Sequence, residues 1–253
     1  MNAFLTALGF LTRIPVLANG INNDSHTLSK SIIFFPIVGG VIGTLTAGLF
    51  ILLHSYLPRS VLSVLIIALP LFMTGGIHFD GLLDTCDGLF SGRSRERCLE
   101  IMRDSRVGSM GVIAGILNVM LRYSILLELP ASLVPLLLIT QAITGRWIMA
   151  LAIYFFPYAR KEGGLGQGFT AEKRIPYIIL SSILALLITL FITGAAGFLV
   201  ALMVAGLTLL IAGWAARRLG GLTGDVYGAL NEVSENIFLL LWMVGICTFN
   251  LNS

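Results

Sequence analysis

A run of 42 residues without a charged side chain, residues 175–216, constrains this chain more than any other feature. A helix crosses the hydrocarbon core of a membrane in about 20 residues. The run is therefore long enough for two spans, and Thr193, Gly194 and Ala195 near its middle predict a turn between them. Helices suit this environment because they satisfy their own backbone polar groups in lipid.

Five further stretches have the length and apolarity of a membrane span. They are residues 31–53, 60–79, 107–127 (with Arg122), 131–156 (with Arg146) and 237–251. Residues 3–14 are too short to span and predict an interfacial or re-entrant helix. Only 11% of the chain is charged, against about 25% in soluble domains. We expect an all-α, polytopic integral membrane bundle of about seven transmembrane helices, forming one domain over residues 1–253.

Basic residues are distributed unequally between the two sides that seven spans define. The N-terminal segment and the loops near residues 80–106, 157–174 and 217–236 hold 13 of the 16 Lys and Arg residues. Lys and Arg are retained on the cytoplasmic side, so we expect the N-terminus and these loops to be cytoplasmic and the C-terminus outside. A net charge of +3 gives no argument for binding nucleic acid.

Three aspartates follow the second predicted span, in "GGIHFDGLLDTCDGL". Asp80, Asp84 and Asp87 have the spacing i, i+4, i+7, which places them within about 60° of arc on one helix face. Like charges this close repel unless a cation lies among them, and a ligand set of oxygens alone suits Mg²⁺ or Mn²⁺. The alternative is a solvated turn rich in Asp and Gly. A position at the end of a membrane span favours the metal site.

The next segment, "RSRERCLEIMRDSRVG", contains five arginines. Guanidinium groups bind phosphate oxygens in a bidentate manner, so arginines beside a divalent-metal site suit a polyphosphate. Arg103 and Arg106, with Asp104, are the candidates, because they lie where the chain returns to the membrane. The alternative is an amphipathic helix stabilised by salt bridges.

Two other predicted cytoplasmic loops contain candidate binding residues. "KEGGLGQGF" is glycine-rich, and the backbone N–H groups of Gly166 and Gly168 are candidates for holding phosphate, although a flexible linker has the same composition. "RRLGGLTGDVYGALNEVSE" brings Asp225, Asn231, Glu232 and Glu235 into one short segment, with a polar turn between helices as the alternative.

Two arginines and one histidine lie within predicted spans. A charge at membrane depth needs a partner, and we expect a substrate phosphate for Arg146. Arg122 is expected to be structural. His78, without a second histidine nearby, is more often a packed and hydrogen-bonded side chain than a ligand.

Six sequence blocks together resemble one known family. "GGIHFDGLLDTCDGL", "ERCLEIMRDSRVGSMGV" and "GGLTGDVYGALNE" are similar to the signature blocks of the cobalamin synthases, the adenosylcobinamide-GDP ribazoletransferases. "FLTRIPV", "FFPIVGGVIG" and "GLGQGF" fit in the same order, so the resemblance covers nearly the whole chain. The departures are mild, at Phe79, Leu83, Cys86 and Arg103, and none removes a carboxylate.

The resemblance implies a transferase that acts in cobalamin biosynthesis, in the cytoplasmic (inner) membrane of a prokaryote. Adenosylcobinamide-GDP would donate its phosphocobinamide part to α-ribazole or α-ribazole 5′-phosphate, with release of GMP and formation of adenosylcobalamin or its 5′-phosphate. Membrane lipid surrounds such a protein, and docking of other enzymes of the pathway and assembly into homo-oligomers are further expectations.

The reaction gives each candidate residue an expected role. Asp80, Asp84 and Asp87, with Asp104, are expected to hold Mg²⁺, and one of these or Asp225 to act as general base. Residues expected to bind substrate are Arg103, Arg106, Arg146, Asn231, Glu232, Gly166 and Gly168.

Two other functions fit part of the pattern. A CDP-alcohol phosphotransferase shares the chemistry and the layout, but its DGxxAR core is absent here. A cation transporter would place acids near the membrane midplane, whereas these acids gather at one face.

Overall fold

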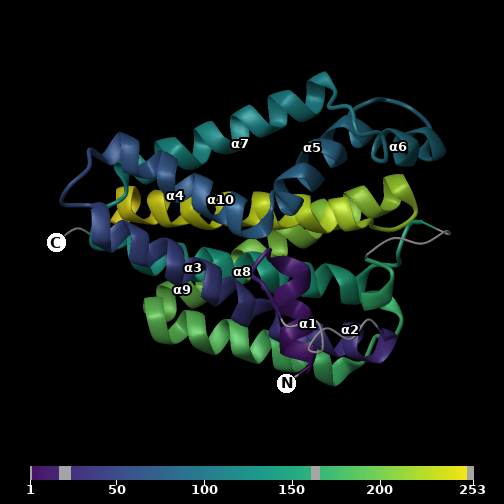
Figure 1. Ribbon diagram of the computed structural model, residues 1–253, viewed down its shortest axis with the longest axis horizontal. Coiled ribbons are helices and arrows are strands. Elements are labelled where there is room, and N and C mark those ends of the chain that lie inside the picture. Colours follow the sequence, from purple (N-terminus) through teal and green to yellow (C-terminus); the bar gives the residue numbers. More distant parts are fainter. Residues whose placement is uncertain (1, 17–23, 161–165, 250–253) are drawn as a thin grey trace.

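The computed structural model describes residues 2–16, 24–160 and 166–249, and every regular element in these ranges is a helix (Figure 1). This confirms the predicted all-α class. In chain order the helices are α1 (Asn2–Leu11), α2 (Ser25–Ser31), η2 (Ile32–Phe34), α3 (Phe35–Leu53), α4 (Arg59–Thr74), α5 (Ile77–Leu89), α6 (Arg95–Ile101), α7 (Ser109–Glu128), α8 (Val134–Phe155), η3 (Gly168–Thr170), α9 (Ile175–Leu219) and α10 (Gly224–Phe249).

Five helical segments in the described part of the chain are long and apolar enough to cross a membrane. They are Ser25–Leu53, α7, α8, α9 and α10. Helices α4 and α5 form a sixth if the pair, which is bent by 92°, counts as one broken span. The polytopic membrane bundle is therefore supported, whereas the count of about seven spans stays a prediction.

Helix α9 folds back on itself at the position of the predicted turn. Gly194 has φ 66° and ψ −165°, a non-helical conformation that glycine adopts without steric cost. A straight helix of 45 residues would separate its ends by about 65 Å. Yet Lys173, just before α9, donates to the carbonyl of Phe156 at 2.6 Å, and Leu222, just after it, donates to the carbonyl of Pro157 at 2.8 Å. Both ends of α9 therefore lie beside the same segment.

Helix α8 forms the centre of the bundle, and small residues let α3 pack closely against it. Most of α8 is buried, whereas α7 and α9 expose many large apolar side chains on their outer surfaces, as lipid-facing helices do. A Cβ atom on Gly43 would lie 2.6 Å from the Cα of Ile139, and one on Gly39 would collide with the carbonyl of Ala142. Only glycine at these two positions permits the observed approach of the backbones.

We expect Gly43→Ala to destabilise the protein by about 1–3 kcal/mol, because α3 and α8 would have to move apart. Unfolding in detergent, followed by circular dichroism, measures the change. Gly48→Ala on the same helix is the control, since nothing lies within 4 Å of a Cβ atom there. Equal stability of the two variants would contradict close α3–α8 packing.

The charged segments gather at one end of the bundle. Arg95 at the start of α6 donates to the carbonyls of Leu219 and Ala159, at 2.5 and 3.1 Å, which joins three segments that are distant in sequence. At the other end, Arg59 donates to the carbonyls of Leu126 and Leu129, next to the α7–α8 turn. The loops that were expected on one side of the membrane therefore lie together (Figure 1).

The N-terminal helix α1 is short, as predicted, and runs across the long helices in Figure 1. Ala7 and Leu11 are fully buried, and Phe10 packs against Phe169 with 4.4 Å between ring centroids. The backbone N–H of Arg13 donates to the carbonyl of Met73, which connects the end of α1 to α4. Its placement relative to a membrane surface stays a prediction.

Candidate functional site

Two glycines lie between the apolar helix α4 and helix α5, which carries Asp80, Asp84 and Asp87, and they turn α5 away from α4. Gly75 and Gly76 have φ angles of 65° and 73°, in the left-handed region that favours glycine. They separate α4 from α5, which are bent by 92° relative to each other. Gly81 then lets α5 contact the start of α10, because a Cβ atom there would lie 2.6 Å from the carbonyl oxygen of Asp225.

Four carboxylates come close together where α5 meets α10. Asp84 is half-buried and lies within electrostatic range of Asp80, Asp87 and Asp225, with Arg160 as the nearby cation. The side chains of Asp80 and Asp84 make no hydrogen bond or ion pair with any described residue. Their mutual repulsion is therefore only partly compensated by the protein, which is the condition under which a cation binds.

Asp87 has a different environment. Its carboxylate accepts hydrogen bonds from the backbone N–H groups of Gly108, at 2.7 Å, and Gly111, at 2.8 Å. A Cβ atom on Gly111 would collide with this carboxylate, which explains why glycines follow the arginine-rich segment. Asp87 thus connects α5 to the first turn of α7, at the positive end of that helix.

The described residues do not form a ready-made metal cage: no group of three or more His, Cys, Asp or Glu side chains among them is arranged to hold an ion alone. Mg²⁺ is usually held by one or two carboxylates and completes its shell with water and substrate phosphate. Asp80 and Asp84, whose side chains have no partner among the described residues, fit that mode in donor chemistry. The residues therefore suit a hard ion that binds together with a phosphate ligand.

Asp225, at the start of α10, is held by an arginine that the sequence did not single out. Arg160 donates from Nη2 to Asp225 at 2.7 Å, and the Thr223 hydroxyl donates to the same oxygen at 3.2 Å. The Nε atom of Arg160 is buried and has no hydrogen-bond partner among the described residues. Arg160 is therefore held in position by its ion pair with Asp225.

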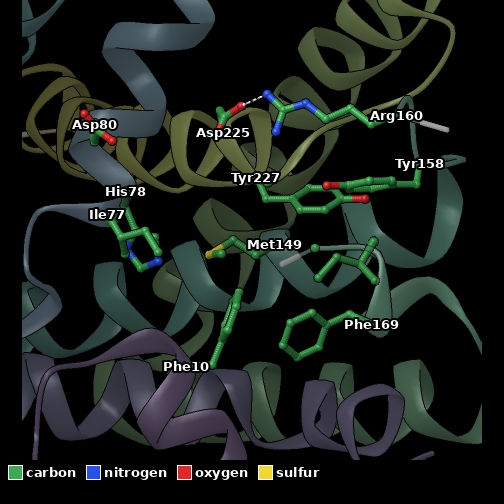
Figure 2. Close-up of a pocket in the computed structure, with 13 residues that line it drawn as sticks. Phe10, Ile77, His78, Asp80, Met149, Tyr158, Arg160, Phe169, Asp225 and Tyr227 are labelled. Atoms are coloured by element: carbon green, nitrogen blue, oxygen red, sulfur yellow. Dashed lines mark hydrogen bonds and ion pairs between the residues drawn. The ribbon is translucent and has the colours of Figure 1, made fainter. Parts of the chain in front are cut away.

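A cavity of about 350 Å³ opens between these residues and the apolar core (Figure 2). It is lined by Phe10, Ile77, His78, Asp80, Met149, Ile153, Tyr158, Arg160, Gly166, Phe169, Gly224, Asp225 and Tyr227. Figure 2 shows Asp80, Asp225 and Arg160 at one end, Phe10 and Phe169 at the other, and the two tyrosines between them. The cavity therefore combines a charged end with an apolar end.

Two open hollows adjoin the cavity and share residues with it. One, of about 350 Å³, is lined by Arg95, Glu96, Leu99, Glu100, Arg103, Ala159 and Arg160. The other, of about 460 Å³, is lined by Arg13, Gly75, Gly76, Ile77, Phe79, Asp80 and Leu83. Arg160 belongs to the cavity and to the first hollow, and Asp80 to the cavity and to the second. The structure thus places the predicted Arg103 beside the cavity.

Arg106 and Asp104 lie farther out and pair with each other. The Arg106 Nη2 atom is 2.6 Å from Asp104 Oδ2, and the Arg106 side chain is 87% exposed. Hydrogen bonds from Arg106 lower the pKa of Asp104 to about 2. Neither residue lines the cavity or the two hollows described above. Their expected roles in binding metal and substrate stay predictions.

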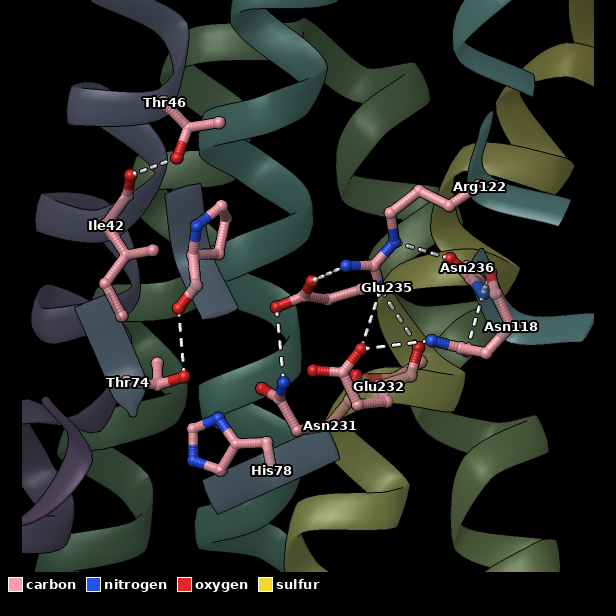
Figure 3. A network of polar contacts seen from close by, with 12 residues as sticks. Ile42, Thr46, Thr74, His78, Asn118, Arg122, Asn231, Glu232, Glu235 and Asn236 are labelled. Carbon is pink, nitrogen blue, oxygen red and sulfur yellow. Dashed lines mark hydrogen bonds and ion pairs between the residues drawn. The ribbon is translucent and has the colours of Figure 1, made fainter. Parts of the chain in front are cut away.

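The buried charges form a network between α7, α8 and α10, and Figure 3 shows the part of it between α7 and α10. Arg122 lies 3.3 Å from Glu232 and 3.2 Å from Glu235, and Arg146 pairs with Glu235. Amide side chains complete the network: Asn118 donates to Glu232 at 3.2 Å, and Asn231 donates to Glu235 at 3.3 Å.

This network corrects the expectation for Arg146. Its guanidinium is 2% exposed and has Glu235 as its partner, so no substrate phosphate is needed to neutralise it. Asn231 and Glu232, also expected to bind substrate, belong to the same network and do not line the cavity. Arg122 has the structural role predicted for it. Arg146 also lies 3.4 Å from His78 Nδ1, and His78 does line the cavity.

Gly166 and Gly168, the two loop glycines that were expected to bind phosphate, have packing roles in the structure. A Cβ atom on Gly166 would lie 3.0 Å from Tyr158 Cε2 and 3.4 Å from Tyr227 Cε2, so glycine there keeps this side of the cavity open. A Cβ atom on Gly168 would lie 2.5 Å from Leu28 Cδ1. Residues 161–165 of the same glycine-rich segment lie outside the described residues. Phosphate binding by this loop stays a prediction.

Together the fold and the site define a polytopic helical membrane protein with an acidic, arginine-lined cavity at one end of its bundle. A family model described as cobalamin-5-phosphate synthase matches residues 3–243, and the chain belongs to this family. Relatives named adenosylcobinamide-GDP ribazoletransferase include those of Desulfitobacterium hafniense, 41% identical over 95% of this chain and 96% of the relative, and Acetivibrio thermocellus, 37% identical over 96% and 97%. No solved structure matches the chain.

Sequence reasoning missed most of the residues that line the cavity. Phe10, Tyr158, Phe169 and Tyr227 come from four different segments, and aromatic residues in an apolar chain give no individual signal. Arg160 was predicted only as one basic residue of a cytoplasmic loop. Its position next to Asp225 depends on a contact across 65 residues of sequence.

Proposed function

We propose that this protein is an adenosylcobinamide-GDP ribazoletransferase, and that the acidic end of the cavity is its reaction centre. The observation that carries the proposal is the meeting of Asp80, Asp84 and Asp225 with Arg160 between two hollows at the charged end of the bundle. Family membership supports the choice of substrates, because the relatives are named for this reaction.

The reaction exchanges a phosphoanhydride bond of the donor for a phosphodiester bond to the acceptor. The ribose 3′-hydroxyl of α-ribazole, or of its 5′-phosphate, attacks the phosphorus that carries cobinamide. The bond from this phosphorus to the bridging oxygen of the diphosphate breaks, and GMP leaves with the electron pair. The hydroxyl proton passes to a carboxylate at the centre, for which Asp84 and Asp225 are the candidates.

Charge increases on the transferring and leaving oxygens, and the residues at this end compensate for it. Arg103 and Arg160 line the hollow next to the cavity, and their guanidinium groups would bind the diphosphate. Asp80 and Asp84, with Asp87, would hold Mg²⁺ or Mn²⁺, which supplies positive charge to the diphosphate oxygens when bound. Positioning of the two substrates provides much of the remaining acceleration.

We further propose that this centre faces the cytoplasm, in the inner membrane of a prokaryote, with the C-terminus outside. The basic segments of residues 93–106, 157–174 and 217–218 lie at the same end of the bundle, which supports a single cytoplasmic side. Both substrates are water-soluble nucleotides or nucleosides, so a centre on this side is accessible to them.

The test is an assay of the purified, detergent-solubilised protein. With Mg²⁺, adenosylcobinamide-GDP and α-ribazole 5′-phosphate, we expect release of GMP in equal amount to the adenosylcobalamin 5′-phosphate formed. Omission of the acceptor should abolish GMP release. Absence of GMP, together with release of CMP from a CDP-alcohol, would replace the proposal with the lipid phosphotransferase alternative.

A further inference from the structure

Arg13 lies beside the proposed reaction centre, although the proposed reaction gives it no role. It follows α1 and belongs to "FLTRIPV", one of the six sequence blocks described above. Arg13 and Asp80 line the same open hollow of about 460 Å³. Because Asp80 also lines the cavity, this hollow borders the charged end of the cavity.

Packing holds Arg13 in this position. Its backbone N–H donates to the carbonyl of Met73 at 2.6 Å. Its side chain lies against the glycine turn between α4 and α5, because a Cβ atom on Gly75 would lie 2.5 Å from Arg13 Nε and 2.9 Å from Arg13 Cγ. Gly75 therefore permits both the left-handed turn and the close approach of the arginine.

The guanidinium of Arg13 has no counter-charge in the described part of the protein. It makes no hydrogen bond or ion pair with a described residue, even though Asp80 lines the same hollow. Its side chain is exposed, so its donors are accessible from the hollow. A guanidinium in this state can bind two oxygens of a phosphate group at once.

Other arginines at this end of the bundle are already occupied. Arg95 donates to two backbone carbonyls, Arg106 pairs with Asp104, and Arg160 pairs with Asp225. Arg13 thus differs from them in having all of its donors available for a ligand.

The Arg13 hollow is separate from the one proposed for the donor diphosphate. The diphosphate hollow contains Arg103 and Arg160, and the two hollows share no lining residue. They also meet the cavity through different residues, Arg160 on one side and Asp80 on the other. A second phosphate group can therefore bind at Arg13 while the diphosphate is bound.

We propose that the Arg13 hollow binds the 5′-phosphate of the acceptor, and that Arg13 thereby selects α-ribazole 5′-phosphate over α-ribazole. The inference rests on the proposed function, which leaves both acceptors open. The attacking 3′-hydroxyl and the 5′-phosphate belong to the same ribose, so a hydroxyl at the carboxylates brings the phosphate close to them. Arg13 supplies the positive charge that offsets repulsion between this phosphate and Asp80.

The experiment compares the two acceptors in the wild-type protein and in Arg13→Gln, with GMP release as the readout. We expect the wild-type protein to favour the phosphorylated acceptor by about tenfold to a hundredfold in kcat/KM, as a hydrogen bond between charged groups predicts. In Arg13→Gln this preference should fall at least about tenfold, whereas kcat/KM for unphosphorylated α-ribazole should stay near the wild-type value. A general loss of structure would instead lower the rate with both acceptors.

Two further variants make the comparison specific. Arg13→Lys keeps the charge without the planar fork, so it should retain part of the preference. Arg93→Gln is the matched control: Arg93 is also exposed, but it lines neither the cavity nor the two hollows. This control should keep the full wild-type preference.

A phosphate in a lipid headgroup has the same chemistry, so the assays are repeated in vesicles of phosphatidylcholine with and without phosphatidylglycerol. An unchanged acceptor preference in Arg13→Gln would overturn the inference. If the variant then lost activity only in vesicles with phosphatidylglycerol, Arg13 would be assigned to a lipid phosphate instead. Absence of GMP release from the wild-type protein with either acceptor would overturn the proposed function, and the inference with it.

Discussion

Asp84→Asn should reduce the rate of GMP release by about a hundredfold or more, while the protein stays folded in the membrane. The carboxylate lies among Asp80, Asp87 and Asp225 and makes no hydrogen bond or ion pair with a described residue. Its negative charge therefore contributes to binding a cation or accepting a proton rather than to stability. An amide of the same shape can do neither.

Two measurements make this prediction specific. The unfolding midpoint of Asp84→Asn should equal or exceed that of the wild-type protein, because the substitution relieves repulsion between like charges. Glu128→Gln, an exposed acid at the other end of the bundle, should keep wild-type activity. Near-normal turnover by Asp84→Asn would remove Asp84 from the reaction centre.

Glu235→Ala should destabilise the protein by about 3–5 kcal/mol. Glu235 is 4% exposed and pairs with both Arg122 and Arg146, so its removal leaves two buried guanidiniums with Glu232 as the nearest carboxylate. Loss of one partner from a buried ion pair costs far more than the pair contributes, because the remaining charge has lost its solvation without compensation. Denaturant or thermal unfolding in detergent measures the change.

The control is an ion pair on the protein surface. Glu100 lies 2.7 Å from Arg97 and is 62% exposed, so Glu100→Ala should cost less than about 1 kcal/mol. The two substitutions remove the same side chain, and burial is the main difference between them. Similar losses of stability in Glu235→Ala and Glu100→Ala would show that the Arg122–Glu235–Arg146 network does not hold the helices together.

Local patterns in the sequence predicted the elements that depend on neighbouring residues. The absence of charge over residues 175–216 predicted two apolar helices, and Gly194 interrupts α9 within the predicted turn. The spacing of Asp80, Asp84 and Asp87 predicted one helix, and all three lie on α5. These predictions succeeded because helix period, span length and glycine conformation are properties of short segments.

Partners from distant segments could not be predicted in the same way. Arg146 was expected to bind phosphate, but its carboxylate comes from Glu235, 89 residues later in the chain. The sequence showed a charge at membrane depth that needed compensation, without showing which group provides it. The cavity likewise depends on the packing of α1, α5, α8 and α10. Such contacts are set by the tertiary fold, which leaves no periodic signal in one sequence.

The account depends most on the binding of a divalent ion by the α5 carboxylates together with the donor diphosphate. Electron paramagnetic resonance of Mn²⁺, titrated into the purified protein with and without adenosylcobinamide-GDP, measures this binding directly. We predict that the donor increases Mn²⁺ affinity in the wild-type protein and that Asp84→Asn abolishes this increase. Equal, donor-dependent Mn²⁺ binding in the wild-type protein and in Asp84→Asn would contradict the account.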